Sequence, residues 1–315
     1  MTGSLDLRHA LLATLVAVIW GFNFVVIQWG MEGVPPLLFA SLRFAAVVVP
    51  AVFFVPRPAA SWRAVAAVGA FMSLGQFGLL YTAMHLGLPP GLAALVLQAQ
   101  VLFTALIAAV WLRERPSLRQ AGGIVVASGG LVVVGVGRGG HVPLSALLLC
   151  LGGALSWGIG NVVARRVAAP TSSGLSMVVW SSVVVPVPLF LLSVLLDGSA
   201  TVGHALAGLG PAAIASTLYT TVLASLVGYS IFNGLLGRYP ASSVVPFVLI
   251  APPVAMASAW LLLGQTVNAA EALGGLVVLA GVLVTVSQRR VAAPQGTTLE
   301  PQPNPERQVH EVARA

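Results

Sequence analysis

Ten apolar segments, each of about 20 residues, follow one another along this chain with short connections between them. They lie at 9–30, 36–56, 63–84, 91–112, 119–137, 144–164, 174–195, 211–235, 241–263 and 269–288. About 20 residues of α-helix cross the hydrocarbon core of a bilayer, and in lipid a helix satisfies its own backbone hydrogen bonds. The segments therefore predict an all-α integral membrane protein with ten transmembrane helices.

Charged residues are too scarce for a soluble protein of this size. They make up 7% of the 315 residues, against roughly 25% in soluble domains, while hydrophobic residues make up 58%. The net charge is +7, and every cationic side chain except histidine is arginine, because the sequence contains no lysine. The arginines lie scattered at the ends of the apolar segments and form no stripe that could follow a phosphate backbone. We therefore expect a lipid bilayer around the chain and no nucleic-acid partner.

The positions of the arginines predict the orientation in the membrane. If the N-terminus is cytoplasmic, the cytoplasmic side holds Arg8, Arg57, Arg63, Arg113, Arg115, Arg119, Arg165, Arg166, Arg238, Arg289 and Arg290. The outer loops then hold only Arg138. Such a bias over short loops sets topology, so we predict a plasma-membrane protein with both termini in the cytoplasm. Residues 289–315 are rich in proline and polar residues, which predicts a disordered cytoplasmic tail.

The two halves of the chain resemble each other. Trp20-Gly21 corresponds to Trp157-Gly158, and a shift of about 151 residues aligns Pro89 with Pro240, Gly123 with Gly274 and Gly130 with Gly281. We therefore predict two repeats, 9–137 and 144–288, of five helices each. An odd number of helices makes the halves cross in opposite directions. Inverted repeats are typical of secondary transporters, whose solute site lies near the midplane between the halves.

Several short strings carry a resemblance to a known family. They are Trp20-Gly21-Phe22-Asn23, Leu42-Arg43-Phe44, Leu97-Gln98-Ala99-Gln100, Val227-Gly228-Tyr229 and Leu235-Leu236-Gly237-Arg238-Tyr239. With the ten segments, they resemble the EamA family of the drug/metabolite transporter superfamily over nearly the whole membrane region. The likeness is closest to bacterial exporters of cysteine-pathway metabolites, O-acetylserine and cysteine. One departure is Gln265, where many relatives carry an acidic residue.

The resemblance implies a secondary transporter that exports small amino acids or related metabolites by alternating access. It also implies protons as a coupling ion, although the carboxylates lie at segment ends or in loops, and facilitated efflux stays open. An exporter of drugs or toxic organic compounds is the alternative within this class. A membrane partner subunit without transport activity is the alternative from another class.

Arg43 is the sharpest candidate for solute binding, because it lies well inside the second segment. A central arginine costs roughly 2.5–3.5 kcal/mol on insertion scales and usually faces a cavity or a partner. It could bind a solute carboxylate, since its planar fork matches that group. Alternatively, it could extend to the outer surface or bond to carbonyl groups of a neighbouring helix.

The remaining candidates are polar or aromatic residues inside the segments. Gln98 and Gln100 are about 200° apart on a helix, so we expect one to face the solute and the other to bond to a neighbouring helix. Asn23 and Asn161 follow the Trp-Gly pairs and could line the path or link helices. The other candidates are Trp20, Gln76, Tyr81, Trp157, Tyr229 and Asn233.

Two local patterns predict special backbone packing. Pro252 and Pro253 lack a backbone N–H, so the carbonyl groups of Val248 and Leu249 could remain free to face solute or a gate. Gly152, Ser156 and Gly160 are spaced by four, which predicts one small-residue helix face in close contact with a neighbour.

No motif indicates catalysis. The sequence has no G-x-S-x-G, H-E-x-x-H or Walker string, and its single cysteine, Cys150, lies in an apolar segment. We therefore expect no enzyme activity, no cofactor and no metal. The oligomeric state cannot be inferred from these residues.

Overall fold

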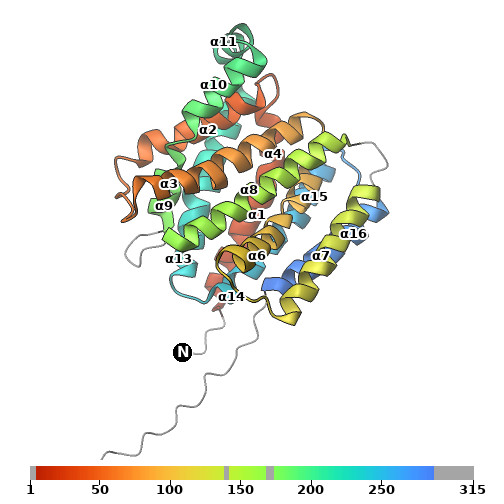
Figure 1. Ribbon diagram of the computed structural model, residues 1–315. Coiled ribbons are helices and arrows are strands. Elements are labelled where there is room, and N and C mark those ends of the chain that lie inside the picture. Colours follow the sequence, from red (N-terminus) through yellow and green to blue (C-terminus); the bar gives the residue numbers. More distant parts are fainter. Residues whose placement is uncertain (1–4, 138–141, 168–173, 287–315) are drawn as a thin grey trace, which may run out of the picture.

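The computed structural model describes residues 5–137, 142–167 and 174–286 (Figure 1). The predictions made for Arg138, for residues 287–288 and for the tail 289–315 lie outside this range.

Every regular element in the described residues is helical. Five helical segments are single helices: α1 (Leu7–Gly30), α2 (Pro36–Ala51), α7 (Leu118–Gly137), α8 (Leu144–Val167) and α16 (Ala269–Val286). The others consist of two or three elements: α3–η1–α4 (Trp62–Gly69, Ala70–Gly75, Gln76–His85), α5–α6 (Pro90–Val96, Ala99–Trp111), α9–α10 (Gly174–Ser182, Pro186–Asp197), α12–η2–α13 (Pro211–Leu218, Tyr219–Val227, Gly228–Leu236) and α14–η3–α15 (Ala241–Val244, Val245–Ile250, Ala251–Leu263). A short helix, α11 (Ser199–Ala207), joins α10 to α12.

Within the described ranges, nine of these helical spans are long and apolar enough to cross a membrane. The chain is therefore an all-helical, multi-pass membrane protein. The remaining apolar helix, α2, has 16 residues and ends at Ala51, whereas the sequence predicted a segment over 36–56. Pro50 lies in its last turn, and Pro56 and Pro58 follow. Proline removes a backbone donor and clashes with the preceding turn, which explains the early end.

The spans pack into two groups that face each other. In one group α8 packs against α3, η1, α4 and α6, and in the other α1 packs against α12, η2, α13, η3 and α15. Two helix pairs complete the bundle: α2 with α10, and α7 with α16, which lie side by side at one edge in Figure 1. The predicted small-residue face of α8 is confirmed, because the Ser156 Oγ donates to the Phe71 carbonyl at 2.7 Å and Gly160 packs against Met72.

Glycines bring α7 and α16 into direct backbone contact. A Cβ on Gly123 would lie 2.7 Å from the Gly281 carbonyl oxygen, and a Cβ on Gly130 would lie 2.8 Å from that of Gly274. The shift of 151 residues in the sequence aligns Gly123 with Gly274 and Gly130 with Gly281. Gly123 therefore contacts the residue aligned with Gly130, and Gly130 contacts the residue aligned with Gly123.

Two spans contain π-helical turns and three contain breaks, which lie between α5 and α6, between α9 and α10, and between α14 and α15. The π-helices η1 and η2 begin at Ala70 and Tyr219, eight residues into their spans (62 to 70 and 211 to 219). Between α14 and α15, the chain forms the 3-10 helix η3, in which the Val248 carbonyl accepts from the Ala251 N–H. The expectation of a free carbonyl at Val248 is therefore wrong, because the tighter turn supplies the donor that Pro252 lacks.

The bundle is closed tightly at the end where α5 begins. There α5 packs against α15, and a Cβ on Gly91 would lie 2.9 Å from the Met256 Cα. At the opposite end of these two spans, α6 packs against α8 and α7, while α14 packs against α13.

Candidate functional site

Arg43 is buried in the interior, with 3% of its surface exposed. Its Nη1 donates to the Tyr81 hydroxyl at 2.7 Å, and its Nη2 donates to the Ser225 hydroxyl at 3.3 Å. The guanidinium carbon lies 4.2 Å from the ring centre of Phe77 and 5.1 Å from that of Phe44. Hydroxyl groups and aromatic faces thus surround a buried positive charge.

Part of this guanidinium has no partner. The Nε–H of Arg43 forms no hydrogen bond, and no carboxylate pairs with Arg43 among the residues that the structure describes. Burying a cation is costly unless an anion or several acceptors compensate it, and aromatic rings compensate it only in part. The described residues therefore leave this buried positive charge without an anion.

The π-helix η2 supplies the other wall of this site. The Ser225 Oγ accepts from Arg43 and donates to the Thr220 carbonyl at 2.8 Å, and the Thr221 Oγ1 donates to the backbone carbonyl of Arg43 at 3.3 Å. Such hydroxyl-to-backbone bonds and the wider π-turn shift the carbonyls of a helix out of their usual register, and π-turns often occur at functional sites. Sequence reasoning missed Thr221 and Ser225, although a run with three hydroxyl residues inside an apolar span was a visible signal.

Trp20 and Tyr229 extend the cluster toward α1. The Trp20 Nε1 donates to the Ala224 carbonyl at 2.9 Å, and its ring centre lies 5.1 Å from that of Tyr229. A Cβ on Gly228 would lie only 2.7 Å from the Trp20 Nε1, so glycine is required for the indole to fit. Arg43, Tyr81, Trp20 and Tyr229 were all proposed from sequence, and the structure brings them into one connected cluster.

Three amide side chains are buried in the same bundle. Asn23, Gln76 and Gln98 have 7%, 2% and 7% of their surface exposed. The Oδ1 of Asn23 and the Oε1 of Gln76 accept no hydrogen bond within the described part of the chain. Leaving a buried acceptor unpaired costs about 1–3 kcal/mol, so each of these oxygens carries an uncompensated cost in this structure. Gln98 lies at the break between α5 and α6.

Two other candidates bond to each other and hold helices together. The Asn161 Nδ2 donates to the Gln100 Oε1 at 3.0 Å and to the Thr104 Oγ1 at 3.1 Å, which links α8 to α6. The amides of Gln100 and Asn161 are thereby occupied in a helix–helix contact.

The last two candidates, Asn233 and Trp157, have other neighbours than the Arg43 cluster. Asn233 of α13 packs against α9, where a Cβ on Gly174 would lie 2.5 Å from its Oδ1. Trp157 is half-buried on α8, next to Gly158, which packs against Phe103 of α6.

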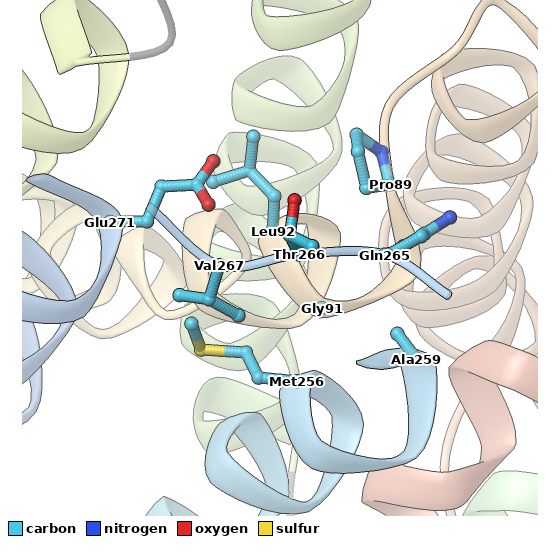
Figure 2. A pocket seen from close by; sticks show the side chains of 9 residues that line it. All are labelled: Pro89, Gly91, Leu92, Met256, Ala259, Gln265, Thr266, Val267 and Glu271. Atoms are coloured by element: carbon cyan, nitrogen blue, oxygen red, sulfur yellow. The ribbon is translucent and has the colours of Figure 1, made fainter. Parts of the chain in front are cut away.

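A small pocket lies at the tightly closed end of the bundle (Figure 2). Its volume of about 20 Å³ is enough for one water molecule, and Met256, Gln265 and Glu271 are among the residues that line it. Glu271 has 2% of its surface exposed and belongs to a capping box, in which its Oε2 accepts from the Asn268 N–H at 3.1 Å. The spacing Asn268-x-x-Glu271 could have predicted this cap from sequence. The carboxylate thus stabilises the start of α16.

A polar, aromatic and cationic cluster buried between helices that are apolar enough to cross a membrane is the arrangement of a membrane transporter for small solutes. Comparison with known proteins agrees with this class. The chain belongs to the EamA-like transporter family, whose model matches residues 7–136 and again 144–287.

Relatives cover almost the whole chain. A protein of Escherichia coli strain K12 named a probable amino-acid metabolite efflux pump is 38% identical over 89% of this chain and 95% of its own length. A protein of the same name from Salmonella typhimurium is 39% identical over 90% of this chain and 96% of its own length. A probable terminal-alkyne amino-acid exporter of Streptantibioticus cattleyicolor is 28% identical over 90% of this chain and 96% of its own length.

One solved crystal structure resembles the fold, with a TM-score of 0.60 and 17% sequence identity over 88% of this chain and 96% of the other. At this identity the likeness shows the fold alone. Together, the family and the relatives identify a multi-pass membrane transporter and not an enzyme.

Proposed function

We propose that this transporter exports small amino acids or related metabolites, with cysteine-pathway compounds favoured, and that Arg43 binds their carboxylate. The observation that carries this proposal is the buried guanidinium without a carboxylate partner in the described chain. A solute carboxylate would supply the missing negative charge and the missing acceptor at Nε.

The buried amides suit the other groups of such a solute. An amino acid carries an ammonium group, which needs acceptors, and the unpaired oxygens of Asn23 and Gln76 are acceptors. Gln98 offers a further amide at the break in its span. The names of the relatives, which refer to amino-acid metabolites and to an amino acid, support the same solute class.

Alternating access between two inverted repeats of five helices is our proposal for the mechanism. It is supported by the two separate matches to one family model, by the π-helices at corresponding places and by the reciprocal glycine contacts of α7 and α16. The close packing of α5 on α15 would be the gate that is closed in this state. The distribution of arginines supports cytoplasmic termini.

A second candidate is export of drugs or toxic organic compounds. The aromatic rings of Phe77, Tyr81, Trp20 and Tyr229 around the cluster favour it, because they can pack against apolar or cationic compounds. The two candidates differ in one requirement. Only a metabolite with a carboxylate needs the charge of Arg43.

Efflux measurements test the proposal directly. Cells that overproduce the protein are loaded with labelled O-acetylserine or cysteine, and efflux is compared with cells that carry an empty vector. Faster efflux supports the proposed solute class, and efflux unchanged for both metabolites but faster for hydrophobic drugs would favour the second candidate. Vesicles that contain only this chain, with and without an imposed proton gradient, then test autonomous transport and proton coupling.

A further inference from the structure

A groove between α1 and α13 lies where α1 begins and α13 ends. Its volume is about 420 Å³, within the range of small-molecule sites. It is lined by Arg8 and Leu12 of α1, by Ser230, Ile231 and Gly234 of α13, and by Arg238, which follows α13. The transport site described above uses none of these side chains.

The groove opens toward the outside of the bundle. Arg8 and Leu15 are seven residues apart, so they share one face of α1, and Leu15 is 46% exposed in a helix long enough to cross the membrane. Ser230 and Gly234 of α13 and Arg238, two residues beyond its end, are spaced by four and are all exposed. Nothing lies within 4 Å of the place where a Cβ on Gly234 would be. The groove is therefore open on the side that faces away from the bundle.

The rim of the groove is positively charged. The Arg238 Nη1 lies 3.3 Å from the His9 Nε2, and the Tyr239 hydroxyl lies 2.9 Å from the His9 Nδ1. These contacts hold Arg238 over the groove. The Asp6 carboxylate lies 2.8 Å from the His9 Nδ1 and is 60% exposed, so it faces solvent beside the groove. Arg8 is exposed on the other wall.

The two arginines and the apolar floor match the two parts of a phospholipid. Arg8 is the second residue of α1, and Arg238 follows the end of α13 by two residues, so both stand at the level where a span leaves the hydrocarbon. Guanidinium groups bind phosphate oxygens through several hydrogen bonds, and basic pockets between transmembrane helices bind anionic head groups. Leu12 and Ile231 continue below them, where an acyl chain would lie.

We propose that this groove is a binding site for an anionic phospholipid, with the phosphate held between Arg8 and Arg238 and one acyl chain along Leu12 and Ile231. The site is separate from solute transport, and its occupancy can be measured without any transport assay. A bound lipid would fill the gap between α1 and α13 and hold these two helices together at this end.

Native mass spectrometry of the full-length protein, released from micelles that contain equal amounts of phosphatidylglycerol and phosphatidylcholine, tests this proposal. We expect wild-type protein to retain phosphatidylglycerol in preference to phosphatidylcholine. We expect the double variant Arg8→Gln/Arg238→Gln to lower that preference by about tenfold or more, since each arginine near a headgroup contributes severalfold. The matched control is Arg119→Gln, which removes an exposed arginine at the second position of α7 and should leave the preference unchanged.

Three results would overturn the proposal. The first is an unchanged preference in the double variant. The second is an equal loss in Arg119→Gln, which would show that the attraction is spread over the surface. The third is displacement of the retained lipid signal by glycerol phosphate at millimolar concentration, which would show a site for small soluble anions. Retention of phosphatidylglycerol in the presence of glycerol phosphate supports the lipid site.

Discussion

The spans that contain η1 and η2 have the same backbone plan but serve different purposes. Each has a π-helix that begins eight residues after its first helical residue (62 to 70 and 211 to 219). In η1 the altered turn accommodates a neighbouring helix, since the Phe71 carbonyl accepts from Ser156 of α8. In η2 the same kind of turn contacts Arg43, through Thr221 and Ser225.

This difference separates the backbone of the two spans from their chemistry. Both spans deviate from a regular α-helix at the same distance from their start, whereas the chemistry at that deviation depends on single side chains. Of the two, only η2 contacts the buried arginine of α2, so the proposed solute site is asymmetric even though the two spans follow a common plan. Substitutions at corresponding places should therefore have unequal effects.

The largest expected effect is that of Arg43→Gln. It removes the charge that we propose for carboxylate recognition and keeps a polar amide at this position. Loss of a buried charged pair costs about 2–5 kcal/mol, which corresponds to at least a thirtyfold loss of transport. Uptake of labelled solute into inside-out vesicles, at equal protein abundance, measures it. Arg119→Gln, on the surface, serves as the control and should transport normally.

A cross-link at the tightly closed end should also stop transport. A Cβ on Gly91 would lie 3.4 Å from the Met256 Cβ, close to the separation in a disulfide. The variant Gly91→Cys/Met256→Cys is made in a Cys150→Ala background, because Cys150 is the only natural cysteine. Oxidation should reduce flux to the background level and reduction should restore it. Full flux in the oxidised, cross-linked protein would rule out this contact as a gate.

Ser225→Ala and Ser156→Ala compare the two π-helices side by side. Ser225→Ala removes an acceptor from Arg43, and we expect the KM for the solute to rise by about tenfold, in line with a hydrogen bond to a charged group. Ser156→Ala removes only a bond to the backbone of η1, so we expect an unchanged KM and a slightly lower melting temperature. Equal rises in KM would remove the distinction between the two spans.

The smallest effect on transport is expected at the contact of α7 with α16. In Gly130→Ala the new methyl group would lie 2.7 Å from the Val278 nitrogen, which should destabilise the fold by about 2 kcal/mol and leave the KM within about twofold. Gly129→Ala is the matched control, because nothing lies within 4 Å of its Cβ position. Thermal unfolding in detergent measures the stability of both variants. Equal melting temperatures for Gly130→Ala and Gly129→Ala would contradict the contact.

Much of the fold could be predicted from the sequence, because apolar length alone determines where a helix can cross a bilayer. The end of α2 could not, since a proline near the end of a helix can either be accommodated or stop it. The hydrogen bond of the Val248 carbonyl could not be predicted either, because a 3-10 turn provides the Ala251 N–H as a donor, whereas a regular α-helix would leave this carbonyl opposite Pro252.

The site could be predicted only in part. Arg43 was identifiable because a charge inside an apolar membrane segment is costly and usually has a function. Its partners Ser225 and Phe77 come from spans that are distant in sequence, so only the fold reveals them. The same holds for Gln100, whose bond to Asn161 depends on how α6 and α8 pack.

The most direct test of the central claim is the affinity of purified protein for O-acetylserine and for its methyl ester, measured on wild type and Arg43→Gln. The two ligands differ in the carboxylate charge that Arg43 is proposed to bind. We predict that wild type binds the free acid at least tenfold more tightly than the ester, and that Arg43→Gln binds both equally weakly. An undiminished preference for the free acid in Arg43→Gln would contradict the proposed role of this arginine.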